Sequence, residues 1–236
     1  GGQIWRGEQS VSSAGARLIE KIRRSNIRFL PGCQVVDAPQ PGTLLCSVNG
    51  EPEWISYDSL VIATGARERF LPFPGWTLPN VYGAGGLQAM ARGGLDLRGK
   101  RVVVCGSGPL LLSAAAALRA HGAEIPLIAE QAPFAHLLRF AWAFRHLPAR
   151  VLDAIGLGKR LFGAGYRSGC YPVRAQGVDR VQSVTLRNST QEWSVRCDYL
   201  ACSFGLAPNL ELPLLLGCRI DAGFAAVNEW QETSVP

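Results

Sequence analysis

Two glycines separated by one residue follow an apolar run at 102–105 and precede a second apolar segment. A phosphate group binds well where backbone N–H groups at a helix N-terminus are exposed and where missing side chains let it approach. Proline at the start of a segment and glycine just past its end favour a helix over residues 109–119. The sequence therefore predicts a phosphate-binding turn formed by Gly106, Ser107, Gly108 and Pro109.

An acidic residue, Glu130, ends the next apolar run, at 125–129. Its distance from the turn is close to the ~20 residues expected for a carboxylate that binds an adenosine ribose. A carboxylate favours NAD over NADP, because it would repel a 2′-phosphate. Leu111 occupies the third position of the G-x-G-x-x-G fingerprint, where Gly or Ala is expected. Two alternatives therefore stay open: a unit that packs in this way but binds nothing, and one that binds another adenine nucleotide such as ATP.

Strands and hairpins surround this β-α-β segment. Asn49-Gly50 accepts positive φ at both turn positions and predicts a tight hairpin between residues 44–48 and 54–56. A similar hairpin is expected between residues 183–187 and 193–196. Residues 60–63 form a continuous apolar run, which is typical of a fully buried strand. Further expectations are a helix capped by Ser12 or Ser13, short strands at 27–30 and 34–36, and a solvated pair of Glu68 and Arg69.

Composition excludes several classes of protein. The chain has 236 residues, of which 47% are hydrophobic and 18% charged, so it is neither disordered nor too short for a core. The net charge of +6 is carried by scattered residues without a nucleic-acid recognition motif. No apolar run is long enough to span a membrane, and no signal peptide is present. The chain opens on glycine rather than methionine, and we interpret it as a fragment.

Seven cysteines are present, and none forms a C-x-x-C pair. Cys105 ends an apolar run, and Cys197 and Cys202 flank another, which favours reduced structural thiols in the cytoplasm over a redox-active pair of Cys197 and Cys202. The three histidines, His121, His136 and His146, have no metal-ligand spacing, and His121 suits the C-terminus of a helix. No metal site is expected. The basic apolar stretch at 133–162 has three interpretations: packing on its own domain, a subunit interface, or a membrane surface.

Several motifs occur together in order along the chain. They are GGQIWR at 1–6, LVIATGA at 60–66, PFPGW at 72–76, GKRVVVCGSGP at 99–109 and GLAPN at 205–209. This series resembles the FAD- and NAD(P)-dependent flavoproteins of the pyridine nucleotide-disulfide oxidoreductase class. Within that class it is similar to the nucleotide-binding subunit of heteromeric amine and amino-acid oxidoreductases, such as hydrogen cyanide synthase, opine oxidase and dye-linked proline dehydrogenase.

The resemblance implies roles for particular residues and a partner chain. Cofactor-binding residues near the flavin would be Gly1, Gly2, Gln3, Ala63, Thr64 and Gly65. The turn at 106–109 and Glu130 would form the second nucleotide site. The oxidation of a CH–NH or CH–NH2 donor would take place largely on a second flavoprotein chain, and no catalytic residue is assigned here. That partner could also bring this cytoplasmic chain to a membrane.

The expected fold is α/β, with two interleaved Rossmann-like dinucleotide-binding folds and β-meander hairpins. Residues 1–97 and 206–236 would form an FAD-binding-type domain, without the glycine-rich FAD fingerprint. Residues 98–205 would form an inserted NAD(P)-binding-type domain. No paired thiol lies near the opening loop, so the pattern does not predict a plain disulfide reductase. Two other functions stay open: a self-contained NAD(P)H-dependent flavin reductase, and a redox-silent nucleotide-binding subunit.

Overall fold

The computed structural model describes residues 13–143, 156 and 161–235. They form two compact units, of which one is Glu68–Gly205 and the other combines residues 13–67 with residues 206–235. The first unit is therefore inserted in sequence within the second. Which cofactor each unit binds, and the predicted division before residue 98, stay predictions.

The inserted unit is built on a five-stranded parallel sheet with strand order β5-β12-β6-β7-β8. Helices connect its strands, and an antiparallel meander of order β11-β10-β9 follows β8. The elements in chain order are β5 Val81–Gly83, α2 Ala84–Arg92, β6 Val102–Gly106, α3 Leu110–Ala120, β7 Leu127–Glu130, α4 Phe134–Ala143, β8 Gly165–Ser168, β9 Tyr171–Gln176, β10 Ser183–Arg187, β11 Glu192–Arg196 and β12 Tyr199–Ser203.

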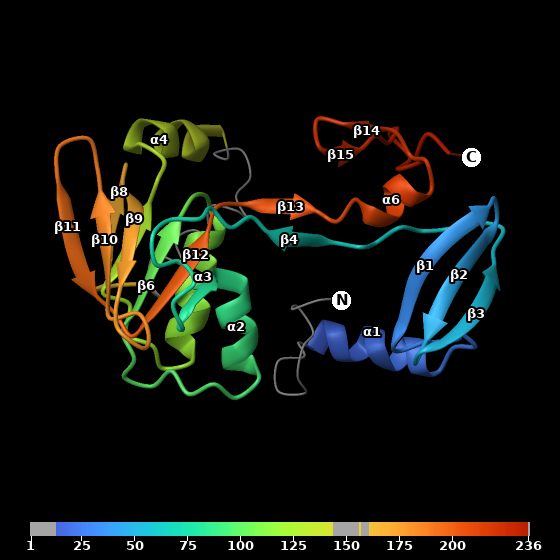
Figure 1. The fold of residues 1–236 in the computed structure, drawn as a ribbon, viewed down its shortest axis with the longest axis horizontal. Coiled ribbons are helices and arrows are strands. Elements are labelled where there is room, and N and C mark those ends of the chain that lie inside the picture. Colours follow the sequence, from blue (N-terminus) through green and yellow to red (C-terminus); the bar gives the residue numbers. More distant parts are fainter. Residues whose placement is uncertain (1–12, 144–155, 157–160, 236) are drawn as a thin grey trace. The chain divides into compact units, whose positions relative to one another are not determined.

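The central strand β6 is buried along its whole length, and its side chains alternate between two cores. Val102 and Val104 face a core that includes Leu87 of α2 and Leu118 of α3. Val103 and Cys105 face the meander, where β10 contributes buried side chains. Figure 1 shows the two helices on one face of this sheet and the meander on the other. This burial on both faces explains why the strand reads as an unbroken apolar run.

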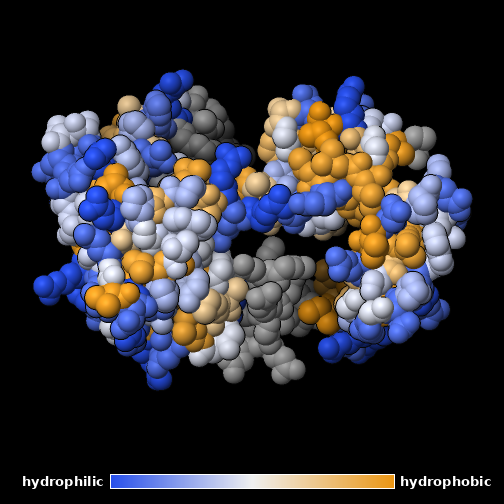
Figure 2. All heavy atoms as spheres, in the orientation of Figure 1, coloured by the Kyte–Doolittle hydropathy of each residue, from blue (hydrophilic) through white to orange (hydrophobic). Residues whose placement is uncertain are grey.

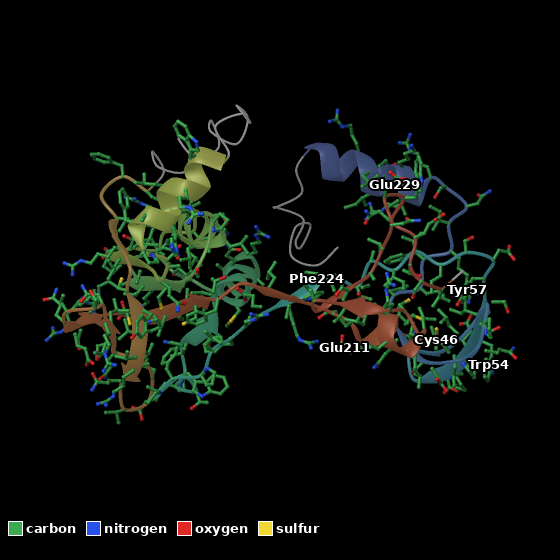
Figure 3. The ribbon with its side chains drawn as sticks, turned by 90° about the horizontal axis from the view of Figure 1, so that it is seen from above. Cys46, Trp54, Tyr57, Glu211, Phe224 and Glu229 are labelled. Carbon is green, nitrogen blue, oxygen red and sulfur yellow. The ribbon has the colours of Figure 1, made fainter. Side chains whose placement is uncertain are left out.

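The second unit contains an antiparallel sheet of order β1-β2-β3 and several short elements. The bounds are α1 Ser13–Arg23, β1 Cys33–Gln40, β2 Thr43–Val48, β3 Glu51–Ser56, β4 Ala66–Glu68, β13 Leu206–Pro208, α6 Glu211–Leu215, β14 Ile220–Asp221 and β15 Phe224–Ala225. Cys46 lies on the buried side of the sheet, whereas Trp54 is 61% exposed on the other side (Figure 3).

Both predicted hairpins are confirmed. Asn49 and Gly50 have φ of 53° and 96°, and Val48 pairs with Glu51 across their turn. In the other hairpin β10 pairs with β11, and the side chain of Asn188 accepts backbone N–H bonds from Thr190 and Gln191. Both hairpins belong to three-stranded meanders. With the parallel sheet, they confirm the predicted α/β, Rossmann-type fold.

Two local expectations are wrong. Residues 27–30 form no strand, and the first strand of the meander starts only at Cys33. Residues 60–63 are not a buried strand: they have no regular structure, and Val61 is 89% exposed. An apolar run becomes a buried strand only where neighbouring strands pair with it. The described residues supply no such partner for 60–63.

The helix α4 covers the first part of the basic apolar stretch. It exposes three large apolar side chains at intervals of four residues, Phe134, Leu138 and Trp142. Residues 144–155 and 157–160, including His146, lie outside the described residues, so the three interpretations of the stretch stay predictions. In the described ranges, no helix has the length and apolar character needed to cross a membrane.

Candidate functional site

The predicted turn lies at the carboxyl end of the parallel sheet, between β6 and α3. Gly106 is paired with Ser203 of β12 on one side and with Glu130 of β7 on the other. A Cβ atom on Gly106 would lie 1.8 Å from the Ser203 carbonyl oxygen, and its φ is +145°. The Ser107 N–H donates to that same carbonyl at 2.7 Å. Glycine is therefore required at residue 106 because β12 passes so closely.

The second glycine of the turn has a different environment. Gly108 has φ of +96°, and a Cβ atom built there would have no other atom within 4 Å. The helix α3 begins two residues later, at Leu110, so the open space adjoins a helix N-terminus. A helix N-terminus favours negative charge. The turn therefore leaves open space beside the start of α3, and its predicted role in binding a phosphate stays a prediction.

Leu111, which departs from the fingerprint, packs in the hydrophobic core. Its side chain is fully buried and packs with Ala114 and Ala115 of the same helix. The third fingerprint position normally lets a helix pack closely on its strand. The buried alanines one turn later keep α3 against β6.

Glu130 lies beside the turn, as predicted, and is 2% exposed. Its Oε2 accepts the Gly108 N–H at 3.0 Å, and its Oε1 accepts the Ala132 N–H at 2.9 Å. The structure thus brings all the predicted residues of the second site together, namely Gly106, Ser107, Gly108, Pro109 and Glu130. Whether the carboxylate also binds a ribose stays a prediction.

Two residues beside this site were not identified from the sequence. Ser203, 1% exposed, supplies the carbonyl that holds Ser107. Its only sequence signal is a polar residue at the end of an apolar run. Tyr166 of β8 pairs with Ile128 of β7, two residues before Glu130. Burial, followed by the charge of Glu130, raises the pKa of the Tyr166 hydroxyl to about 12.

The predicted flavin-side turn lies in the second unit, just before β4. The Thr64 hydroxyl donates to the Asn209 carbonyl at 2.9 Å, and the Asn209 side-chain amide donates to the Thr64 carbonyl at 2.9 Å. The Asn209 N–H also donates to the Gly65 carbonyl at 3.0 Å. This latch joins the ATG and GLAPN motifs, although the motif pattern assigns Asn209 no role. Ala63, Thr64 and Gly65 are exposed, whereas Gly1, Gly2 and Gln3 lie outside the described residues.

An ion pair follows the latch along the same two segments. Arg67 of β4 binds Glu211 at the start of α6. The hydrogen bond from Arg67 lowers the pKa of the Glu211 carboxyl below its ordinary value. Both side chains are exposed, so the pair contributes little to stability.

Glu68 is not half of a solvated pair with Arg69, and that expectation is wrong. The Glu68 carboxylate accepts the Gly85 N–H at 2.8 Å and the Gly86 N–H at 3.1 Å. These groups belong to the first turn of α2, whose N–H groups lack partners within the helix. A Cβ on Gly83 would lie 2.4 Å from the same carboxylate, so the glycine-rich start of α2 makes room for it.

The seven cysteines are free thiols, and all except the half-buried Cys33 are buried. Cys105 and Cys202 lie opposite each other on β6 and β12, with their Sγ atoms 3.8 Å apart. The contact with Cys202 and complete burial raise the pKa of the Cys105 thiol well above its ordinary value. These thiols are therefore packing groups in the core.

Comparison with known proteins places the chain in a family. The family model described as pyridine nucleotide-disulphide oxidoreductase matches residues 3–236. The chain is 31% identical to the HcnB subunit of hydrogen cyanide synthase from Pseudomonas aeruginosa, covering 100% of this chain and 57% of that protein. It is also 31% identical to an opine oxidase subunit from Rhizobium meliloti, covering 93% of this chain and 52% of that protein. The chain thus spans about half the length of these relatives.

Solved structures agree with this placement. A ferredoxin reductase from Rhodopseudomonas palustris aligns with a TM-score of 0.62 and 28% identity, over 86% of this chain and 48% of that one. A thioredoxin reductase from T. acidophilum has a TM-score of 0.67 over 94% of this chain and 69% of its own, and at 20% identity it shows the fold alone. The chain belongs to the pyridine nucleotide-disulphide oxidoreductase family of FAD- and NAD(P)-dependent oxidoreductases.

Proposed function

We propose that this chain is part of one subunit of an FAD-dependent oxidoreductase. It binds FAD through the unit that contains Thr64 and Gly65, and a second adenine nucleotide at the turn after β6. Electrons come from the oxidation of an amine or amino acid on a partner flavoprotein chain. The observation that carries the second site is the open space at Gly108, which adjoins the start of α3 and the buried Glu130.

The amine or amino-acid donor and the partner chain are supported by the curated relatives. Those relatives are named as subunits of hydrogen cyanide synthase and opine oxidase. By analogy with these subunits, this chain would be a cytoplasmic subunit that acts together with a second chain. FAD would belong to the unit formed by residues 1–97 and 206–236, and NAD(P) or ATP to residues 98–205.

The residues of this chain would bind and orient the cofactors. A bound flavin and nicotinamide supply the hydride-transfer chemistry. The backbone of Gly108 would let a pyrophosphate approach, and the N-terminus of α3 would stabilise its charge. The latch between Thr64 and Asn209 would fix the exposed Gly65 backbone next to the flavin.

A second candidate function is a self-contained NAD(P)H-dependent flavin reductase. It is favoured by the likeness to a ferredoxin reductase, which extends over 86% of this chain. A third, a redox-silent nucleotide-binding subunit, is favoured by two positions of the fingerprint. Pro109 has no N–H to offer a phosphate, and Leu111 replaces the usual third glycine.

The first test is an anaerobic titration of the full-length protein with NADH, followed by the absorbance of its flavin. Copurification of a second flavoprotein chain that oxidises amines supports the proposal. Bleaching without such a chain favours the reductase. A flavin that NADH leaves oxidised, in protein that copurifies with no such chain and still binds NADH or ATP, favours the redox-silent subunit.

The site itself is tested by Gly108→Ala, with Gly94→Ala as the matched control. Gly94 has φ of +104° and equally open space, so both variants carry the same kind of backbone strain. Only Gly108→Ala places a methyl group where the phosphate would approach. We expect it to weaken nucleotide binding by about ten-fold or more, measured by calorimetry, while Gly94→Ala binds like the parent. Equal binding by all three proteins would contradict a nucleotide site at this turn.

A further inference from the structure

In the described part of the chain, the two buried polar or charged residues are Glu130 and Ser203. They lie at the ends of β7 and β12, the two strands that flank β6. Both are paired in register with the same residue, Gly106. The buried polar groups of this chain thus converge on one turn, which they contact from opposite sides.

The backbone N–H groups of the turn are largely engaged by these neighbours. The Ser107 N–H donates to the Ser203 carbonyl at 2.7 Å, and the Gly108 N–H donates to Glu130 at 3.0 Å. The Leu111 N–H donates to the Gly108 carbonyl at 3.1 Å, and Pro109 has no N–H. The Gly108 amide is therefore already bound by a carboxylate and is not offered to a ligand.

The same carboxylate also holds the loop that follows β7. Its other oxygen accepts the Ala132 N–H at 2.9 Å, and the Gln131 N–H donates to the Gly106 carbonyl at 2.7 Å. Glu130 therefore joins the ends of β6 and β7 through two charge-assisted hydrogen bonds, which are stronger than neutral ones. With 2% of its surface exposed, its hydrogen bonds are with the protein backbone.

We propose that Glu130 is a positioning residue of the second nucleotide site. Its carboxylate holds Gly108 in the conformation that leaves the space beside α3 open, so it supports the phosphate-binding part of the site. This role differs from the ribose contact that the sequence pattern predicts. That the ligand is a nucleotide rests on the proposed function. The hydrogen bond by which Glu130 fixes the turn is a property of the protein alone.

A comparison of two ligands separates the two roles. ADP and 2′-deoxy-ADP differ only in the ribose hydroxyl, and Glu130→Gln keeps the shape but loses the charge and one acceptor. A positioning residue acts on the part of the site that binds the phosphates, which both nucleotides share. Glu130→Gln should therefore weaken the binding of both nucleotides by the same factor, about ten-fold. Calorimetry on the full-length protein measures this. If Glu130→Gln weakens the binding of ADP but leaves the binding of 2′-deoxy-ADP unchanged, the proposal is overturned in favour of a ribose contact.

Hydrogen exchange tests, without any nucleotide, whether the Glu130 carboxylate fixes Gly108. In the free protein, Glu130→Gln should speed the exchange of the Gly108 amide by about ten-fold, because its acceptor is weakened. Glu124→Gln removes an exposed carboxylate from the same unit and should leave that amide unchanged. If Glu130→Gln fails to fold, Glu130→Asp keeps the charge, reaches one methylene less and should show the same acceleration.

The two experiments also separate failure of this inference from failure of the proposed function. If the parent protein binds neither ADP nor 2′-deoxy-ADP, the nucleotide site is wrong, and the exchange of Gly108 still decides whether Glu130 braces the turn. If both ligands bind and the Gly108 amide exchanges equally in the parent and the Glu130 variants, the proposed function stands and the positioning role is refuted.

Discussion

Glycine serves two different purposes within three residues of the turn after β6. At residue 106 a side chain is excluded by the protein itself, because the Ser203 carbonyl occupies the position of its Cβ. At residue 108 the space is open, so glycine there serves something other than packing. A sequence pattern cannot distinguish these two purposes, since both positions are glycines of the same fingerprint.

This difference predicts unequal losses of stability in two alanine variants. Gly106→Ala forces a methyl group against backbone in an unfavourable φ region, so it should lower the free energy of unfolding by about 3 kcal/mol or more. Gly108→Ala carries only the backbone strain and should cost about 1 kcal/mol. Urea denaturation measures both. Equal losses for the two variants would contradict the role assigned to Ser203.

At the scale of elements, the second unit depends on contacts between segments that are far apart in the sequence. Thr64 and Asn209 are 145 residues apart, and their reciprocal bonds hold the start of β4 to the end of β13. The apolar side chains of α6 and β15, including Leu214, Leu215 and Phe224, lie exposed nearby in the same unit (Figure 2). With so little apolar burial there, polar contacts should carry much of the local order.

Asn209→Asp is expected to loosen this latch. Aspartate has no amide donor for the Thr64 carbonyl, so the amides of residues 64–67 should exchange about five-fold faster or more. Mass spectrometry of deuterated peptides measures this. Asn188→Asp is the matched control, because Asn188 acts through its acceptor oxygen, which aspartate keeps. Unchanged exchange at 64–67 in Asn209→Asp would show that the latch does not hold the turn.

The sequence predicts elements where the determining contacts are local. The turn at Asn49-Gly50 and the strand that ends at Gly106 follow from turn chemistry and an apolar run. Residues 60–63 have the same apolar pattern as β6 but no neighbouring strand among the described residues. The apolar pattern alone therefore does not predict a buried strand. The partners of Glu68 and Glu130 could not be predicted either, because both carboxylates bind backbone groups, which leave no trace in the residue types.

At the scale of the whole molecule, ionisable groups buried in the inserted unit link its stability to alkaline pH. Burial, the largest cause, raises the pKa of the Cys197 thiol from its ordinary value of 9.0 to about 12. A raised pKa means that the folded protein holds this proton more tightly than the unfolded chain does. The resulting stability is complete below the unfolded pKa, near 9, and is lost as the pH rises through the folded value.

The difference in unfolding free energy between the parent and Cys197→Ala should therefore shrink as the pH rises from about 9 towards about 12. The variant lacks the thiol that the unfolded parent ionises, so its own stability should fall less steeply with pH. Urea titrations at several pH values measure the difference directly and cancel the titration of groups that the substitution does not affect. Val184→Ala, which removes a buried apolar side chain of the same unit and no titratable group, serves as the control and should show no such trend. A difference for Cys197→Ala that stays constant across this range would mean that burial does not couple this thiol to folding.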